Sequence, residues 1–240
     1  MKNVGLIETI KIIGGKAVLL EFHIERLKTS LNKLGISISE NEVRNKLEAH
    51  IYSEQFKSPI PNFRFRLEVT QLVNKNTMHW ESSSMPLLPD IQLPLRITIY
   101  HQQVKEINSV CNLKNTDRTI YHQAQQFATE NNYDTAIVLN ENNTIADAPI
   151  FNLFMIKENT IFTPPLADAP VAGVFRQFLL QQNLPIQEQS ITPEILIEAE
   201  EIFLTNAIRG IIEVGEIESK KLQNIQTKKI KTVIETAIGY

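Results

Sequence analysis

The sequence has few of the cysteine and histidine residues that bind transition metals. It contains one cysteine, Cys111, which excludes an internal disulfide and a Cys-x-x-Cys metal motif. No two of its five histidines have the i, i+4 spacing that places two imidazoles on one helix face. We therefore expect no metal site, and we expect surface or structural roles for all of them: His23, His50, His79, His101 and His122.

Long hydrophobic runs and basic stripes are also absent. No stretch approaches the ~18 apolar residues of a transmembrane helix, and the N-terminus lacks the apolar core and cleavage site of a secretory signal. We therefore expect a cytoplasmic protein with no membrane partner. The 24 Lys and Arg residues against 27 Asp and Glu residues give a net charge of −3, which argues against a nucleic-acid partner. Residues 220–232, KKLQNIQTKKIKT, are the most basic stretch, and we interpret them as a solvated strand or helix face.

Glycine is scarce as well. The eight glycines form no GxGxxG or GxxxxGK phosphate motif and no GxSxG nucleophile motif. With 240 residues, 42% of them apolar, the chain can form one large or two modest domains. Its chemistry must then come from lysines, carboxylates and backbone turns.

The first hundred residues show the pattern of an α+β unit with an antiparallel sheet. The helix expected over 39–56 begins with a capping box, Ser39 with Glu42. The strand expected over 62–73 alternates apolar and polar residues, and the segment 93–100 repeats that alternation. Further elements are two strands within 5–22 around Gly14 and Gly15, and a helix over 23–35 that stops at Gly35. Residues 101–113 have weak periodicity and are a candidate interdomain connection.

The second half of the chain alternates helices and strands. A helix entered through Gly173 is expected over 171–183, and another begins with Thr192 as its N-cap and Pro193 at its first position. The remaining elements are a helix over 116–132, a strand over 134–141, a strand-rich segment over 145–166, and two strand-like runs within 201–217.

Five short motifs then follow one another in a recognisable order. They are FHIERLKTSL (22–31), LKNTDRTIYHQA (113–124), YDTAIVLNENNTIADAPIFNLFMIKENTIFTPPL (133–166), VAGVFRQFLL (171–180) and IFLTNAIRGI (202–211). In this order the chain resembles the fold-type IV pyridoxal-phosphate enzymes, the class IV aminotransferase family. That family includes branched-chain and D-amino-acid aminotransferases and aminodeoxychorismate lyases. The resemblance covers roughly residues 5–215.

The resemblance implies an α+β fold of two domains. A small antiparallel N-terminal domain would span 1–106. A larger pseudo-barrel domain would span 107–240 and carry the lysine that forms a Schiff base with pyridoxal 5′-phosphate. That lysine falls on Lys114, and the acid that contacts the pyridine nitrogen falls on Asp147. The family usually has Glu at the acid position, so Asp147 is a departure that shortens the side chain by one methylene.

The resemblance also implies phosphate contacts and a last cofactor loop. Phosphate would be bound by Arg26 and by the turn at Gly173, Val174 and Phe175, since guanidinium groups and N–H groups at a helix start bind anions well. The loop would contain Asn206 and Ala207, and Arg209 is a candidate for binding a substrate carboxylate.

Lys114 must lose its proton to act as a nucleophile or base, which requires burial or nearby positive charge. Nothing in the residues around it establishes this, and Lys105 is its nearest rival. A solvated lysine and a turn aspartate are the alternatives for Lys114 and Asp147.

Two details favour an aminodeoxychorismate lyase over an aminotransferase. Phe175 stands where aminotransferases of the family usually have Thr, and Asn206 with Ala207 resembles the lyase version of the last loop. The alternatives are a branched-chain or D-amino-acid aminotransferase, or a family member with weakened chemistry that acts as a binding protein. We further expect a small-molecule substrate and a homodimer, because family sites borrow residues from a partner subunit.

Overall fold

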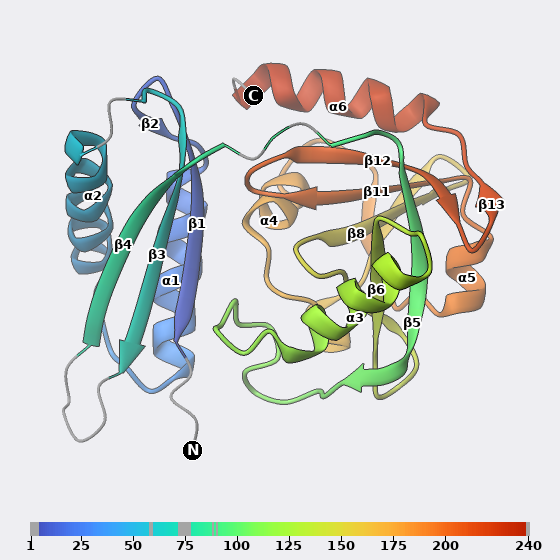
Figure 1. The fold of residues 1–240 in the computed structure, drawn as a ribbon, viewed down its shortest axis with the longest axis horizontal. Helices are drawn as coiled ribbons and strands as arrows, with labels where there is room; N and C mark the ends of the chain where they lie inside the picture. The colour runs from blue at the N-terminus through green and yellow to red at the C-terminus, as the bar shows by residue number, and fades with distance from the viewer. Residues whose placement is uncertain (1–4, 58–59, 72–77, 88, 90, 239–240) are drawn as a thin grey trace. The chain divides into compact units, whose positions relative to one another are not determined.

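The computed structural model describes residues 5–57, 60–71, 78–87, 89 and 91–238 (Figure 1). The chain divides into two compact units, which are described separately. Unit 1 comprises Met1–Asp90 and Leu113–Asp117, and unit 2 comprises Ile91–Asn112 and Arg118–Tyr240. The boundary expected at 106/107 therefore falls inside unit 2, and the segment that contains Lys114 belongs to unit 1.

Unit 1 contains a four-stranded antiparallel sheet in the order β2-β1-β3-β4. The expected alternation in β3 is confirmed: Phe63, Phe65, Leu67 and Val69 are buried, and the residues between them are partly exposed. This period of two gives the sheet one apolar face, which the unit's helices cover. The strands are β1 (Leu6–Ile13), β2 (Lys16–Ala17), β3 (Phe63–Gln71) and β4 (Met78–Pro86).

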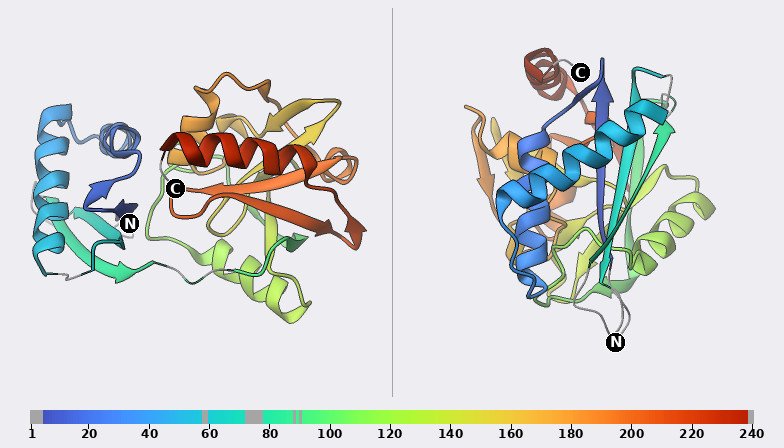
Figure 2. Two further views of the ribbon diagram at one scale, coloured as in Figure 1. Left: turned by 90° about the horizontal axis from the view of Figure 1, so that it is seen from above. Right: turned by 90° about the vertical axis from the view of Figure 1, so that its left-hand side faces the viewer.

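Two helices pack on this sheet, α1 (Leu20–Lys33) against β1 and α2 (Glu40–Lys57) against β3 and β4 (Figure 2). Helix α1 begins three residues before the expected start. It is followed by Gly35 at φ +80°, a conformation that glycine adopts without steric cost. Helix α2 begins after Ser39, whose Oγ accepts a hydrogen bond from the Glu42 N–H at 3.2 Å. The backbone half of the capping box is therefore present.

Unit 2 is built on a curled, mixed sheet, which in the described chain has nine strands (Figure 1). Its order is β10-β9-β8-β11-β12-β5-β6-β7, with β13 paired to β12. The pairs β10·β9, β12·β5 and β5·β6 are parallel, and the others are antiparallel. The strands are β5 (Leu95–Lys105), β6 (Thr135–Asn140), β7 (Ile145–Asp147), β8 (Asn152–Lys157), β9 (Thr160–Thr163), β10 (Ile186–Glu188), β11 (Glu201–Asn206), β12 (Gly210–Ile217) and β13 (Lys220–Lys221).

One expectation about the first hundred residues is wrong. Strand β5 pairs in parallel with β6 and β12, so it belongs to unit 2 and not to the antiparallel sheet. Its first residues are buried nearly continuously, as in strands covered on both faces. The local alternation over 93–100 indicates a strand but carries no information about which distant strand pairs with it.

The helices of unit 2 pack on its sheet, α3 on β5 and β6, α4 on β11, and α6 on β11 and β12. The cap of α5 is as expected: Thr192 accepts from the Ile195 N–H, and Pro193 occupies the first turn. Among the described residues no helix is long and apolar enough to cross a membrane. The helices are α3 (Thr119–Glu130), α4 (Val174–Leu180), α5 (Pro193–Ile197), α6 (Ile225–Ile238) and the 3-10 turn Leu166–Asp168.

Candidate functional site

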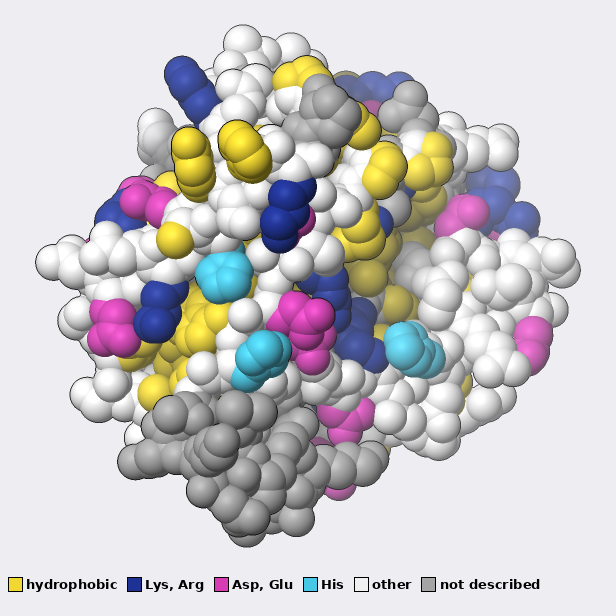
Figure 3. Space-filling model, turned by 60° about the vertical axis from the view of Figure 1, so that its left-hand side comes forward, with side chains coloured by type: hydrophobic (Ala, Val, Ile, Leu, Met, Phe, Trp, Pro, Cys, Tyr) yellow, Lys and Arg dark blue, Asp and Glu magenta, His cyan; other side chains and the backbone are white. Residues whose placement is uncertain are grey.

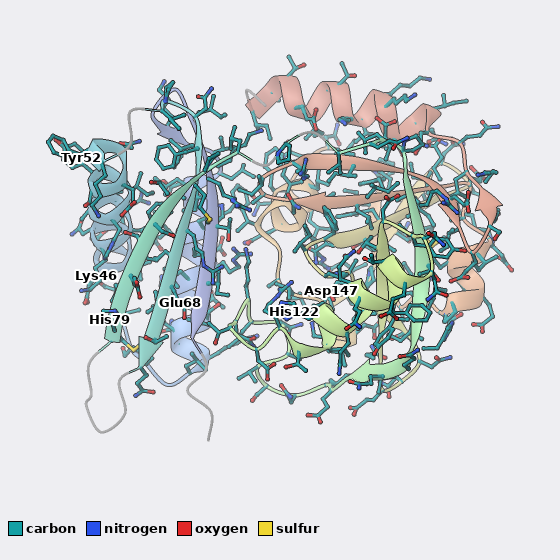
Figure 4. The ribbon with its side chains drawn as sticks, in the orientation of Figure 1. Lys46, Tyr52, Glu68, His79, His122 and Asp147 are labelled. Atoms are coloured by element: carbon teal, nitrogen blue, oxygen red, sulfur yellow. The ribbon has the colours of Figure 1, made fainter. Side chains whose placement is uncertain are left out.

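Asp147 is a buried carboxylate in unit 2. It ends β7 with an exposed fraction of 1%, and Figure 4 labels it beside α3. The Tyr121 hydroxyl lies 3.0 Å from both of its carboxylate oxygens, and the Val171 N–H donates to Oδ2 at 2.8 Å. Lys105 Nζ lies 3.7 Å from the same Oδ2. A buried carboxylate normally needs such donors and a cation to remain charged.

Lys105 and Tyr121 extend this cluster. Lys105, the last residue of β5, donates to the Tyr121 hydroxyl at 2.5 Å, which leaves the phenol proton for Asp147. Burial lowers the pKa of Lys105 more than the adjacent Asp147 raises it. Burial and Asp147 together raise the pKa of Tyr121 well above its ordinary value. The Tyr121 phenol is therefore a neutral donor to Asp147.

Neither partner was identified from the sequence as a partner of Asp147. In the sequence Lys105 is only a rival candidate to Lys114, and no motif marks Tyr121. A usable signal exists for Tyr121, because it shares the buried face of α3 with Ala124 and Ala128 at helical spacing. A hydroxyl on such a face usually has a hydrogen-bond partner.

The turn at Gly173 packs too closely for any side chain. A Cβ at this position would lie 1.8 Å from Oδ1 of Asn152, whose amide donates to the Val171 carbonyl at 2.8 Å. Gly173 is the N-cap of α4, and Val174 and Phe175 follow it with buried side chains. The structure brings this turn close to Asp147, since Val171 contacts both Asp147 and Asn152. Phosphate binding by these N–H groups stays a prediction.

The loop between β11 and β12 is shaped by Asn206. Its Oδ1 accepts the N–H groups of Ile208 at 2.9 Å and Arg209 at 2.8 Å, and Gly210 follows at φ +67°. This is an Asx-type turn, so the asparagine side chain holds the loop through its own backbone. Ala207 and Arg209 lie partly exposed in the same loop. The cofactor and substrate roles of these residues stay predictions.

Arg26 lies in unit 1, in a buried ionic cluster. Its Nε and Nη2 atoms donate to the two carboxylate oxygens of Glu8 at 2.8 and 2.5 Å. His23 Nδ1 lies 2.5 Å from the same carboxylate. Burial alone would raise the pKa of Glu8, but Arg26 and His23 lower it to about 2. Burial lowers the pKa of His23 more than the adjacent Glu8 raises it, and Arg26 supplies a positive charge beside the same carboxylate.

The sequence carries a signal for this cluster that was missed. Glu8 shares the buried alternating face of β1 with Leu6, Ile10 and Ile12. A charged residue at such a position implies a buried partner. His23, expected to be a surface or structural histidine, is buried and structural.

Lys114 also lies in unit 1. Its Nζ donates to Thr9 Oγ1 at 3.0 Å, and its carbonyl accepts the Ile7 N–H at 2.8 Å. The adjacent Asn115 forms a bridge with Leu6, so this short segment is held against β1. Because Lys114 and Asp147 belong to different units, the prediction that both contact one cofactor stays a prediction.

Charged side chains of opposite sign lie next to one another on the surface. On the face in Figure 3, Lys and Arg side chains lie among Asp, Glu and His side chains. Arg66 and Glu68 on β3 pair at 3.2 Å, and Glu68 is labelled in Figure 4. Among the residues that the structure describes, no group of three or more acidic, His or Cys side chains is arranged to hold a metal.

The residues present suit the cofactor that the resemblance implies. Asp147 is a buried carboxylate, the kind of group that suits a protonated ring nitrogen. Arg26 offers a guanidinium for a phosphate, although Glu8 already balances part of its charge. Lys114 offers an amine. Considered within each unit separately, these side chains have the charges and functional groups that bind pyridoxal 5′-phosphate.

Comparison with known proteins identifies the family. The model of the amino-transferase class IV family matches residues 5–217. The chain is 24% identical to D-alanine aminotransferase of Bacillus licheniformis, over 98% of this chain and 87% of that protein. It is 25% identical to aminodeoxychorismate lyase of Bacillus subtilis, over 99% of this chain and 89% of that protein.

The fold agrees with this assignment. The crystal structure of 4-amino-4-deoxychorismate lyase from Pseudomonas aeruginosa superposes with a TM-score of 0.86 at 20% identity. It covers 98% of this chain and 92% of the other. At this identity the likeness establishes the small antiparallel sheet and the curled mixed sheet of fold-type IV, and the relatives divide between two activities. This chain is a member of the class IV aminotransferase family, whose enzymes use pyridoxal 5′-phosphate.

Proposed function

We propose that the protein is a 4-amino-4-deoxychorismate lyase, which eliminates pyruvate and forms 4-aminobenzoate. The observation that carries this choice over an aminotransferase is the pair of lyase-like positions: Phe175 after Gly173, and Asn206 with Ala207. The relative from Bacillus subtilis supports it, because that protein is an aminodeoxychorismate lyase. Fold alone does not decide the reaction.

The proposed roles follow the chemistry of each side chain. Asp147 would bind the protonated ring nitrogen, and Arg26 would bind the phosphate together with the turn from Gly173 to Phe175. When bound, pyridoxal 5′-phosphate supplies an electron sink for the charge left after a proton is removed. Lys114 would be the amine that bonds to the cofactor and is displaced by the amino group of the substrate.

The displaced Lys114 would then move one proton. It would remove the proton from the substrate ring carbon that carries the amine, and deliver a proton to the methylene of the enolpyruvyl group. The bond between the ring and the ether oxygen breaks, the ring becomes aromatic, and the methylene becomes the methyl group of pyruvate. The elimination needs no oxidant, reductant or keto acid, and aromaticity of the product favours it.

The alternative is an amino-acid aminotransferase, which the relative from Bacillus licheniformis favours. The two reactions share the lysine and differ in co-substrate. An aminotransferase needs a keto acid to accept the amine, whereas the lyase does not. The requirement for a keto acid therefore separates them.

Product analysis tests the proposal. Purified protein loaded with pyridoxal 5′-phosphate is given aminodeoxychorismate with no keto acid, and pyruvate and 4-aminobenzoate are measured. We expect equal amounts of both products, and at least a 100-fold slower rate for Lys114→Ala, because acid–base catalysis is commonly worth 10²–10⁴-fold. Keto-acid-dependent amine transfer with no pyruvate release would contradict the lyase and favour the aminotransferase.

A further inference from the structure

Lys105 has no role in the proposed reaction, yet it lies in the Asp147 cluster. Its ammonium group is 3.7 Å from Asp147 Oδ2 and 2.5 Å from the Tyr121 hydroxyl, and only 11% of its side chain is exposed. The other charged or titratable groups that act on it are Arg118 at the start of α3 and Cys111. Arg118 lies over the Tyr121 ring at 4.4 Å from its centroid.

Lys105 is poorly placed to be the lysine that bonds to the cofactor. In pyridoxal 5′-phosphate the carbon that reacts with an amine lies across the ring from the nitrogen. If Asp147 binds that nitrogen, as the proposed function assumes, the reacting amine must lie a ring's length away from the carboxylate. An ammonium that is paired with the same carboxylate would instead lie near the ring nitrogen, where its charge affects that nitrogen.

We propose that Lys105 is a positioning residue that acts through Asp147 and makes the bound ring nitrogen hold its proton less tightly. This inference rests on the proposed function. The ammonium balances the charge of Asp147 before any ligand binds. A protonated ring nitrogen then becomes the second cation beside one carboxylate, and the two cations repel each other.

The sign of the effect follows from electrostatics. A positive charge close to a titrating group always favours its deprotonated form, and in a buried site the shift is commonly one to three pKa units. Tyr121 fixes the arrangement, because its hydroxyl bonds to Lys105 and to both oxygens of Asp147. Lys105 thereby sets how strongly the ring withdraws electrons from the reacting carbon.

The test uses pyridoxamine 5′-phosphate labelled with ¹⁵N in the ring. This form has no aldehyde, so it cannot bond to Lys114, and the ¹⁵N chemical shift reports whether the ring nitrogen is protonated. The shift is followed against pH in the parent protein, in Lys105→Gln, which keeps a donor and loses the charge, and in Lys105→Arg, which keeps the charge. Lys105→Met provides a second neutral variant if the glutamine variant does not fold.

We expect the pKa of the bound ring nitrogen to rise by roughly one unit or more in Lys105→Gln or Lys105→Met. Lys105→Arg should remain close to the parent. A merely structural lysine would change affinity or stability and leave this pKa in place. Equal pKa values in all proteins, or a lower value in the neutral variants, would overturn the inference alone. A parent protein that does not bind pyridoxamine 5′-phosphate would overturn the inference together with the proposed function.

Discussion

At the scale of single residues, Glu8 is expected to contribute strongly to stability. Its carboxylate is buried and paired with Arg26, and its pKa falls to about 2 in the folded protein against 4.5 when unperturbed. The lowered pKa means that the folded state is stabilised above pH 4.5 and loses this contribution as pH falls toward 2. The shift corresponds to about 3 kcal/mol. Burial lowers the pKa of His23, so the folded state also loses stability as pH falls below the ordinary value of 6.5.

Glu8→Gln should therefore lower the free energy of unfolding by about 3 kcal/mol at pH 7, since the buried Arg26 loses the Glu8 carboxylate that balances its charge. The difference from the parent should shrink as pH falls below 4.5. Urea unfolding at a series of pH values measures both. The matched control is Glu21→Gln, which breaks the exposed pair of Glu21 with Arg44 and should cost less than about 1 kcal/mol. Equal losses in the two variants would contradict the buried-pair account.

Gly173 is a second position where the addition of one atom, a Cβ, is expected to change stability. The Cβ of Gly173→Ala would overlap Asn152 Oδ1, and Asn152 is held by its bond to Val171. We expect a loss of about 1–3 kcal/mol, as for other forced contacts in packed interiors. In the double variant with Asn152→Ala the overlap disappears, so the two losses should not add. Strict additivity in unfolding experiments would argue against the contact.

At the scale of elements, adjacent residues predict a helix or strand correctly where those residues themselves set its ends or its buried face. The cap at Thr192, the stop at Gly35 and the alternation in β3 are all read from adjacent positions. The partners of β5 were missed because they lie far along the chain, at β6 and β12. Parallel strands are joined by a long crossover connection, so no short turn sequence between them indicates that they pair.

Hydrogen exchange tests the placement of β5. Its amide at Ile97 should be protected to the same extent as those in β6, because β5 lies between β6 and β12 in one sheet and shares their hydrophobic core. The two-residue strands β2 and β13 should exchange much faster. Fast exchange at Ile97, with β6 still protected, would contradict the pairing.

The α5 cap gives a second test at this scale. Thr192→Ala removes the oxygen that accepts the Ile195 N–H and should lower the free energy of unfolding by about 1 kcal/mol. Thr192→Ser keeps the oxygen and should restore most of this loss. If Thr192→Ser is as unstable as Thr192→Ala, the cap does not account for the effect.

At the scale of the whole molecule, the order of motifs predicted the family and the two-part α+β fold. The surroundings of the site residues were not predicted in the same way. Asp147 was found from its motif, whereas Lys105 and Tyr121 reach it from β5 and α3, segments that only tertiary folding brings together. Likewise Arg26 was named for a phosphate, and its buried pairing with Glu8 comes from a different element.

We also propose that the protein is a homodimer. In that case light scattering should give twice the chain mass of 27.4 kDa. The measurement is made on protein loaded with pyridoxal 5′-phosphate at concentrations where activity is detected. A monomer that retains full activity would contradict the proposal that the site needs a partner subunit.

The proposed function depends most on Lys114 being the amine that bonds to pyridoxal 5′-phosphate. Borohydride reduction of the loaded protein fixes the cofactor to that amine, and mass spectrometry of tryptic peptides locates it. Cleavage between Lys105 and Lys114 distinguishes the two candidates. We predict the cofactor mass on Lys114 in the parent and no trapping in Lys114→Ala. Label on Lys105, or on no lysine at all, would contradict the central claim.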